Sequence, residues 1–199
     1  MEKTVAVRPA TRQDVEPLSR VLARAFRKDP FHRWIFPQER AWERNSQRSF
    51  ALALRAEVEH GSVFTDEELQ GAAIWRDPAM GPVSFWERVR LAVPMMFLLG
   101  RRSSLVLGGL NRLLALRPKE PHWYLSVLGT DPEHQKRGIG CALVRAGLAR
   151  CDEGGAAAYL EASRPENVPY YERRGFEVVG QLQMPGGPPV WRMSYAPRS

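Results

Sequence analysis

Two short segments in the C-terminal half carry residue types that bind phosphates and move protons. Residues 135–140 read Gln-Lys-Arg-Gly-Ile-Gly and stand between a predicted strand and a predicted helix. Backbone amides at the start of a helix attract an anion. Further along the chain, Asn167 and Tyr171 precede Gly175. Because a positioned phenol can donate a proton and recover it later, the two segments predict a site that holds a phosphorylated ligand beside a proton donor.

The glycines of the first segment explain how a phosphate would be held. Gly138 and Gly140 lack side chains, so backbone amides between Lys136 and Ala142 can approach a pyrophosphate closely. The segment is not a P-loop, because no Gly-Lys-Ser/Thr follows, and it lacks the third glycine of a dinucleotide-binding fingerprint. Taken alone, a glycine turn between a strand and a helix is equally compatible with a purely structural role.

The surrounding residues predict a mixture of strands and helices. Residues 125–130 form a strand that begins near Trp123, and residues 139–152 form the helix after the glycine turn. Further strands are predicted at 5–8, 62–65, 72–75, 157–161, 176–183 and 190–195. Further helices are predicted at 11–29, 42–60, 166–174 and 84–116, the last broken at Pro94, Gly100, Gly108 and Gly109. We therefore expect residues 1–199 to form a single α+β domain with one sheet covered on both faces.

Composition supports a folded domain and argues against nucleic-acid binding. The 199 residues are 44% apolar and 26% charged, with a formal net charge of +7 and a pI near 9.9. Clustered Lys and Arg would attract nucleic-acid phosphates, but the basic residues are scattered, the densest groups being the pairs Arg101-Arg102 and Arg173-Arg174. We expect no nucleic-acid partner, and a basic rim would favour a small polyanionic ligand.

Cysteine spacing and hydropathy indicate the compartment. Cys141 and Cys151 lie on one predicted helix, about 15 Å apart, which is too far for a disulfide. Neither has a Cys or His at metal-ligand spacing, so we expect free thiols and no metal site. The N-terminus has no apolar signal segment, and residues 91–99, the most apolar stretch, are less than half of a membrane span of about 20 residues. We expect a reduced cytoplasmic location and no membrane partner.

Together, the strand, the glycine turn and the segment from Asn167 to Phe176 resemble the acyl-CoA-binding half of the GCN5-related N-acetyltransferase (GNAT) superfamily. Within it, residues 117–125 and 171–176 are similar to puromycin N-acetyltransferase-like proteins. The resemblance implies an α/β/α layered fold with a mixed sheet of about six to seven strands, splayed at an acyl-CoA-binding bulge. It also implies acetyl-CoA as the cofactor and an amine as the acetyl acceptor.

The resemblance assigns roles to individual residues. The pantetheine arm would pair with the splayed strand, where Gly129 suits a bulge or a close backbone approach. The pyrophosphate would lie on the glycine turn, and Asn167 would contact the cofactor arm. The implied cofactor-binding residues are Val127, Leu128, Gly129, Thr130, Gln135, Lys136, Arg137, Gly138, Ile139, Gly140, Cys141, Ala142, Asn167 and Tyr171.

Tyr171 is the candidate general acid. Acetyl transfer from a thioester to an amine needs a neutral nucleophile and a proton for the departing thiolate. The family places a tyrosine four residues before this glycine near the sulfur. The alternative is a tyrosine packed over Phe176 with its hydroxyl in water. Tyr170 is expected to face elsewhere on the helix.

A general base is harder to assign, because the strand before the glycine turn carries Ser126 where many family members have glutamate. Glu161, at the end of the next predicted strand, could accept a proton or orient the amine. Equally, it could only cap a helix or pair with Arg164. His122 is a third candidate.

The acceptor site should lie among aromatic residues, and three functions stay open. The predicted substrate pocket comprises Phe31, Trp34, Phe36, Trp75, Trp123 and Tyr124. Residues 95–99 either pack as core or form an adaptable pocket wall. The favoured function is N-acetylation of a small-molecule amine, such as an antibiotic or aminonucleoside. The others are acetylation of protein or peptide amines and non-catalytic acyl-CoA sensing, by a monomer or a homodimer.

Overall fold

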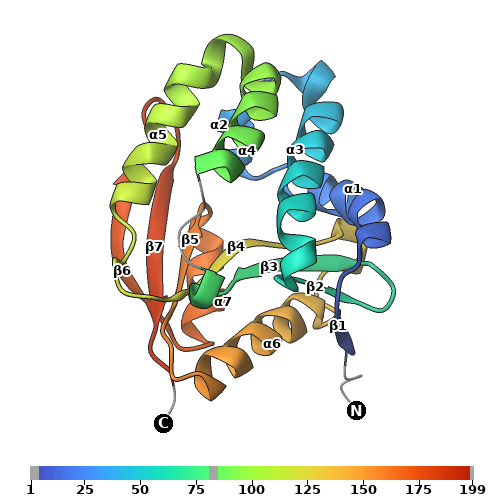
Figure 1. The fold of residues 1–199 in the computed structure, drawn as a ribbon, viewed down its shortest axis with the longest axis vertical. Helices are drawn as coiled ribbons and strands as arrows, with labels where there is room; N and C mark the ends of the chain where they lie inside the picture. The colour runs from blue at the N-terminus through green and yellow to red at the C-terminus, as the bar shows by residue number, and fades with distance from the viewer. Residues whose placement is uncertain (1–4, 81–84, 198–199) are drawn as a thin grey trace.

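The computed structural model describes residues 5–80 and 85–197, with side chains except at residues 85–91. These residues form a seven-stranded mixed sheet with helices on both faces, as predicted (Figure 1). The strands are β1 (Val7–Pro9), β2 (Val63–Asp66), β3 (Gly71–Arg76), β4 (Trp123–Thr130), β5 (Ala158–Ala162), β6 (Phe176–Gln183) and β7 (Pro189–Tyr195). The helices are α1 (Val15–Ala25), α2 (Pro30–Ile35), α3 (Trp42–Glu57), α4 (Phe85–Leu99), α5 (Ser103–Ala115), α6 (Ile139–Glu153) and α7 (Val168–Glu172).

The sheet is splayed between its two central strands. The strand order is β1-β2-β3-β4-β5-β7-β6, with β4 and β5 parallel and the other neighbours antiparallel. The parallel ladder joins residues 123–125 to residues 158–160 and ends there. Residues 127–130 of β4 continue to pair with β3. A gap therefore opens between the C-terminal ends of β4 and β5.

Helix α6 covers one face of the sheet. Trp75 of β3 is fully buried there, and its indole nitrogen donates a hydrogen bond to the Leu143 carbonyl at 3.3 Å. The indole lies against Gly147, where an added Cβ would come within 2.0 Å of the ring. Glycine at this position therefore lets α6 approach the sheet.

Helices α1 and α3 cover the opposite face. Leu18 and Leu22 of α1 pack with Phe50 and Leu54 of α3 in a second buried cluster. At the start of α1, Asp14 accepts hydrogen bonds from the Thr11 amide at 2.7 Å and from Arg8 Nη1 at 2.8 Å. The bond from Arg8 is the main cause that lowers the pKa of Asp14 to about 2. The helix predicted over 11–29 thus begins as a 3-10 turn, Arg12–Asp14, and continues as the shorter α1.

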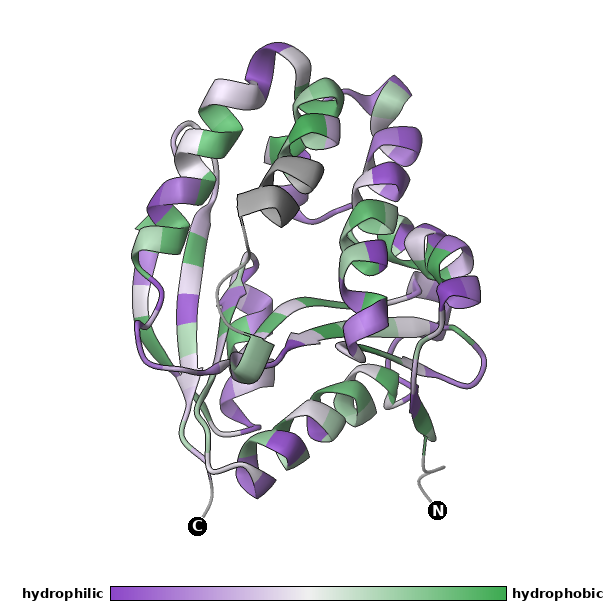
Figure 2. Ribbon diagram, viewed as in Figure 1, coloured by the Kyte–Doolittle hydropathy of each residue, from purple (hydrophilic) through white to green (hydrophobic). Residues whose placement is uncertain are grey.

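A third apolar cluster lies among α2, α4, α5 and the turn before β7. Figure 2 shows hydrophobic residues along α5 and the described part of α4. Trp34 of α2 packs on Gly109, where an added Cβ would meet the indole at 2.7 Å. The predicted helix over 84–116 breaks at Gly100, whereas Pro94 lies inside α4 and Gly108 and Gly109 lie inside α5. The other predicted breaks were wrong: Gly109 packs against Trp34, whereas Gly108 has open space beside it, and neither interrupts α5.

Helix α2 was not predicted. Its six residues are too few to show a helical period, and Asp29-Pro30 indicated the end of the preceding helix. In the structure, Asp29 caps α2 by accepting from the His32 amide at 2.8 Å, and Pro30 occupies the first turn. Across residues 5–80 and 85–197, no helix is long and apolar enough to cross a bilayer.

Candidate functional site

A cavity of about 500 Å³ lies where β4, α6 and α7 meet the end of α1. It is lined by the part of β4 that extends beyond the ladder with β5. Its lining includes residues of both predicted segments and residues at the end of α1 or just after it. The lining comprises Ala25, Phe26, Asp29, Leu128, Gly129, Thr130, Gln135, Lys136, Gly138, Ile139, Gly140, Cys141, Arg164, Asn167, Tyr170, Tyr171 and Arg174.

The glycine turn has the backbone shape that anion binding requires. Lys136 and Gly138 adopt left-handed conformations, with φ of 64° and 84°. Gly138 caps α6, so the first amides of a long helix point toward the cavity. A Cβ on Gly140 would lie 3.2 Å from the Tyr170 hydroxyl. The turn therefore keeps open a space beside the helix that a side chain would fill.

Most predicted cofactor-binding residues line this cavity, but three do not. Val127 packs toward α1 and α3 on the other side of the sheet. Arg137 lines a separate hollow beside β1. The Ala142 amide already donates to the Gly138 carbonyl at 2.9 Å, so it is engaged within the helix.

The bulge in β4 lies at Ser126, so of the two roles predicted for Gly129, a bulge or a close approach, the bulge is not observed. Ile74 pairs with Val127 and Trp75 pairs with Leu125, which leaves Ser126 as the extra residue. Gly129 instead permits close packing, because an added Cβ would lie 2.7 Å from Leu22 and 3.0 Å from Phe26. The alternative of a close backbone approach at Gly129 is thus the one observed.

Tyr171 is buried at the edge of the cavity. Its ring packs edge-on against Phe176, with centroids 5.8 Å apart. Burial is the main cause that raises the pKa of Tyr171, and the nearby charge of Asp29 adds to this effect. The phenol is therefore protonated at neutral pH, as a general acid must be before it donates.

Tyr170 also lines the cavity, so the prediction that it faces elsewhere was wrong. Helix α7 has five residues, and the two adjacent tyrosine rings stand nearly perpendicular, with centroids 5.2 Å apart. This arrangement lets both rings border one cavity from successive positions.

Asp29 is a cavity residue that sequence reasoning missed. Its carboxylate accepts from the His32 amide and from the hydroxyl of Ser163, which follows β5. Burial raises the pKa of Asp29, although these hydrogen bonds oppose the shift. In the sequence, Asp29-Pro30 is typical of a helix boundary, so Asp29 was interpreted only as part of that boundary. In the structure its carboxylate also connects α2 to the residue after β5.

Glu161 belongs to a different network. It pairs with Arg117, with Nε and Oε1 2.8 Å apart, and it accepts from the Tyr124 hydroxyl at 2.5 Å. Arg164, the expected partner, pairs instead with Glu166. Glu161 does not border the cavity that contains Tyr171.

Tyr124 and Ser126 line a second cavity, of about 600 Å³, further back along β4. Arg117 and His122 border the same cavity. The bulge of β4 therefore stands between two hollows, one lined by residues before Val127 and one by residues after it.

The predicted aromatic pocket does not form. Trp75 and Trp123 belong to the core against α6, while Trp34 and Phe36 belong to the third cluster, with Phe31 packed against it. Tyr124 alone of the six lines a described cavity outside these clusters, the one shared with Ser126. Large aromatic residues in this sequence indicated core packing more than a binding site.

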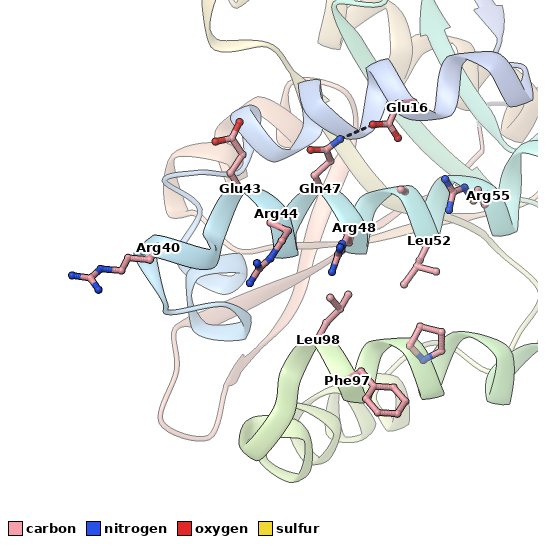
Figure 3. A pocket seen from close by; sticks show the side chains of 12 residues that line it. Glu16, Arg40, Glu43, Arg44, Gln47, Arg48, Leu52, Arg55, Phe97 and Leu98 are labelled. Atoms are coloured by element: carbon pink, nitrogen blue, oxygen red, sulfur yellow. Dashed lines mark hydrogen bonds between the residues drawn. The ribbon is translucent and has the colours of Figure 1, made fainter.

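A separate groove of about 880 Å³ lies between α3 and α4 (Figure 3). Arg44, Arg48 and Arg55 line it from α3, opposite Phe97 and Leu98 of α4. It contains neither the glycine turn nor a tyrosine, so it is distinct from the cavity at the splayed strands.

Comparison with known proteins identifies this arrangement. The model of the Acetyltransferase (GNAT) family matches residues 20–176, a range that includes the splayed strands, the glycine turn and Tyr171. The chain belongs to the GNAT acetyltransferase family. This confirms the predicted superfamily, the fold and the enzyme class of acyl-CoA-dependent N-acetyltransferases. The finer similarity to puromycin N-acetyltransferase-like proteins stays a prediction.

Individual GNAT relatives agree with the family. A crystal structure of "histone acetyltransferase HPA2 and related acetyltransferase" from Corynebacterium glutamicum is 25% identical, with a TM-score of 0.73 over 98% of both chains. The PaiA N-acetyltransferase of Thermoplasma acidophilum, solved in complex with coenzyme A, has a TM-score of 0.59 at 13% identity over 97% of this chain and 99% of that one.

A curated relative matches over a shorter stretch. The mycothiol acetyltransferase of Propionibacterium freudenreichii subsp. shermanii is 40% identical over 62 residues, which are 30% of this chain and 20% of that protein. The match thus spans about a fifth of the length of the curated relative.

Proposed function

We propose that this GNAT protein transfers an acetyl group from acetyl-CoA to a primary amine of a small molecule. The observation that carries the proposal is one cavity in which a glycine turn, a buried phenol and a buried carboxylate meet. Anion binding, proton donation and proton acceptance are the functions that this transfer requires.

The residues present fit coenzyme A. The turn at Gly138 and Gly140 presents helix amides to a pyrophosphate, and the gap between β4 and β5 leaves β4 backbone groups available to a pantetheine amide. When bound, acetyl-CoA supplies the activated acetyl group as a thioester. Asn167 borders the same cavity and is positioned to contact the cofactor arm.

Tyr171 and Asp29 would handle the two protons of the reaction. The amine nitrogen attacks the thioester carbonyl carbon and the carbon–sulfur bond breaks. We assign Tyr171 Oη as the donor to the departing thiolate and the Asp29 carboxylate as the acceptor of the amine proton. Burial raises the pKa of Asp29, so this carboxylate is a stronger base than an exposed one.

Glu161 is the second candidate for the base. Its carboxylate is paired with the Arg117 guanidinium and does not border the cavity that contains Tyr171, whereas Asp29 does. We propose that Glu161 and its partners instead shape the acceptor side of β4, where the second cavity is bounded by Tyr124 and Ser126. A volume of about 600 Å³ is within the range of small-molecule sites.

Thiol release from acetyl-CoA, measured with a panel of amines, tests the proposal. The panel contains puromycin, polyamines, aminoglycosides, amino acids and short peptides, and each is assayed with the wild type and Tyr171→Phe. Turnover of a small amine that collapses in the variant is expected. Turnover of peptides alone would identify a peptide acetyltransferase, whereas coenzyme A binding without turnover of any amine would favour the sensor function.

A further inference from the structure

Tyr170 presents a buried hydroxyl that lacks a hydrogen-bond partner among the described residues. The hydroxyl stands beside Gly140 and near Thr130 Oγ1, since an added Cβ on Gly140 would lie 3.2 Å and 3.5 Å from these two oxygens. It therefore borders the first turn of α6. Burial raises the pKa of Tyr170 to about 12, so the group is a hydrogen-bond donor throughout the neutral range. A buried donor without an acceptor is costly.

Arg174 adds a second donor at the same place. Its guanidinium stacks on the Tyr170 ring at 3.5 Å from the centroid, and its Nη1 donates to the Tyr170 carbonyl. The Nε of Arg174 is buried and also lacks a partner among the described residues. Within the same part of the chain, no carboxylate forms an ion pair with this arginine.

The Cys141 thiol, in the first turn of α6, also lines this cavity together with Arg174. Burial raises the pKa of Cys141, but hydrogen bonds from Arg174 and Arg145 outweigh it and lower the pKa below its usual value. Arg174 therefore places positive charge beside the first turn of α6, in the cavity that the glycine turn also lines.

We propose that Tyr170 and Arg174 form a side-chain clamp for a phosphate group of coenzyme A, beside the backbone amides of the glycine turn. The inference rests on the proposed function, because it takes coenzyme A as the ligand. Phosphate oxygens would accept from the Tyr170 hydroxyl and from the guanidinium, which supplies the missing acceptors. In this proposal the adjacent tyrosines have different roles, since Tyr170 binds the cofactor and Tyr171 transfers the proton.

Calorimetric binding of a ligand series to the full chain tests the clamp. The ligands are coenzyme A, dephospho-coenzyme A, which lacks the 3′-phosphate, and pantetheine, which lacks all phosphates. The variants are Tyr170→Phe and Arg174→Leu. Arg173→Leu is the control. It removes the same positive charge as Arg174→Leu, but Arg173 is exposed and does not line the cavity.

Tyr170→Phe and Arg174→Leu should each weaken coenzyme A binding about tenfold or more, while pantetheine binding and the behaviour of Arg173→Leu stay at wild-type level. An equal loss with dephospho-coenzyme A would assign the contact to the pyrophosphate, and a loss confined to coenzyme A would assign it to the 3′-phosphate. Unchanged coenzyme A binding, or an equal loss with pantetheine, would overturn the clamp.

Turnover separates this inference from the proposed function. With saturating acetyl-CoA, the control variant Arg173→Leu should keep kcat within about twofold of the wild type, because Arg173 lies outside the cavity. Wild-type protein that binds coenzyme A but acetylates no amine would refute the proposed function and leave the binding test of the clamp in force.

Discussion

The C-terminal segment, from β4 to α7, and the N-terminal segment, from α1 to α2, line the same cavity with different chemistry. The C-terminal segment, with Arg174 just after it, contributes backbone amides, two tyrosines and two arginines, Arg164 and Arg174. The N-terminal segment contributes apolar contacts from Ala25 and Phe26 and one carboxylate, Asp29. In the proposed reaction, the C-terminal segment would bind the cofactor and donate the proton, while the N-terminal segment would accept the proton from the amine.

The largest expected effect comes from removing the proton donor of the C-terminal segment. Tyr171→Phe should lower kcat by about 10²- to 10⁴-fold and leave the KM for acetyl-CoA nearly unchanged. Steady-state thiol release measures both constants. Tyr170→Phe is the matched control, since it removes a neighbouring hydroxyl and should change binding instead. A larger loss of kcat in Tyr170→Phe would reverse the assignment of the two tyrosines.

The next effect tests the contribution of the N-terminal segment. Asp29→Asn keeps a good helix cap for α2 but cannot accept a proton, so kcat/KM should fall by about 10²-fold or more. Burial raises the pKa of Asp29, so wild-type kcat/KM should rise with pH as this carboxyl loses its proton above its usual range. The variant should lack that rise in a pH profile.

Glu161→Gln is the comparison for this measurement. If Glu161→Gln abolished the rise of kcat/KM with pH while Asp29→Asn preserved it, Glu161 would be the base. Circular dichroism of both variants checks that the fold persists, because Glu161 is paired with Arg117 inside the protein.

A smaller effect concerns the helices that adjoin the N-terminal segment. In Gly109→Ala the added methyl group would meet Trp34 of α2, and overpacking should lower the free energy of unfolding by about 1–3 kcal/mol. Gly108 has open space around its Cβ position, so Gly108→Ala should be neutral or raise that free energy by up to about 1 kcal/mol. Urea denaturation compares the two. Equal destabilisation by both would contradict the packing of α2 on α5.

The smallest effect concerns the anchor of α1. Because the folded-state pKa of Asp14 is about 2, below the unfolded value of 3.8, its stabilisation is present above pH 3.8 and disappears as pH falls toward 2. Asp14→Asn should therefore lower the free energy of unfolding by about 1–2 kcal/mol at pH 7 and less at acid pH. Denaturation at both pH values measures this, with the exposed Glu59→Gln as control. A pH-independent difference would argue against the pairing with Arg8.

The glycine turn and Tyr171 could be predicted from the sequence because local spacing determines them. Gly138 begins a helix and Tyr171 stands at a fixed distance before Gly175, so both signals lie within a few residues. Asp29 could not be predicted as a site residue, because it approaches Ser163 across 134 positions of sequence. The bulge at Ser126 was missed for the same reason, since the register of β4 depends on its partner β3.

The predicted aromatic pocket does not form, because its tryptophans are buried in the core clusters. Trp34 and Trp75 carry large apolar surfaces, and burial against Gly109 and Gly147 stabilises the fold more than exposure to a pocket would. Residue type alone does not distinguish these two uses of tryptophan.

The gap between β4 and β5 has a consequence for hydrogen exchange. Backbone groups of residues 126–130 that point toward β5 have no partner strand within the described chain, so their amides are open to solvent when no ligand lies between the strands. A bound pantetheine arm would take the place of the missing strand segment and slow the exchange of these amides. The same residues that leave the sheet incomplete thus act as a built-in reporter of occupancy, readable without any knowledge of the acceptor.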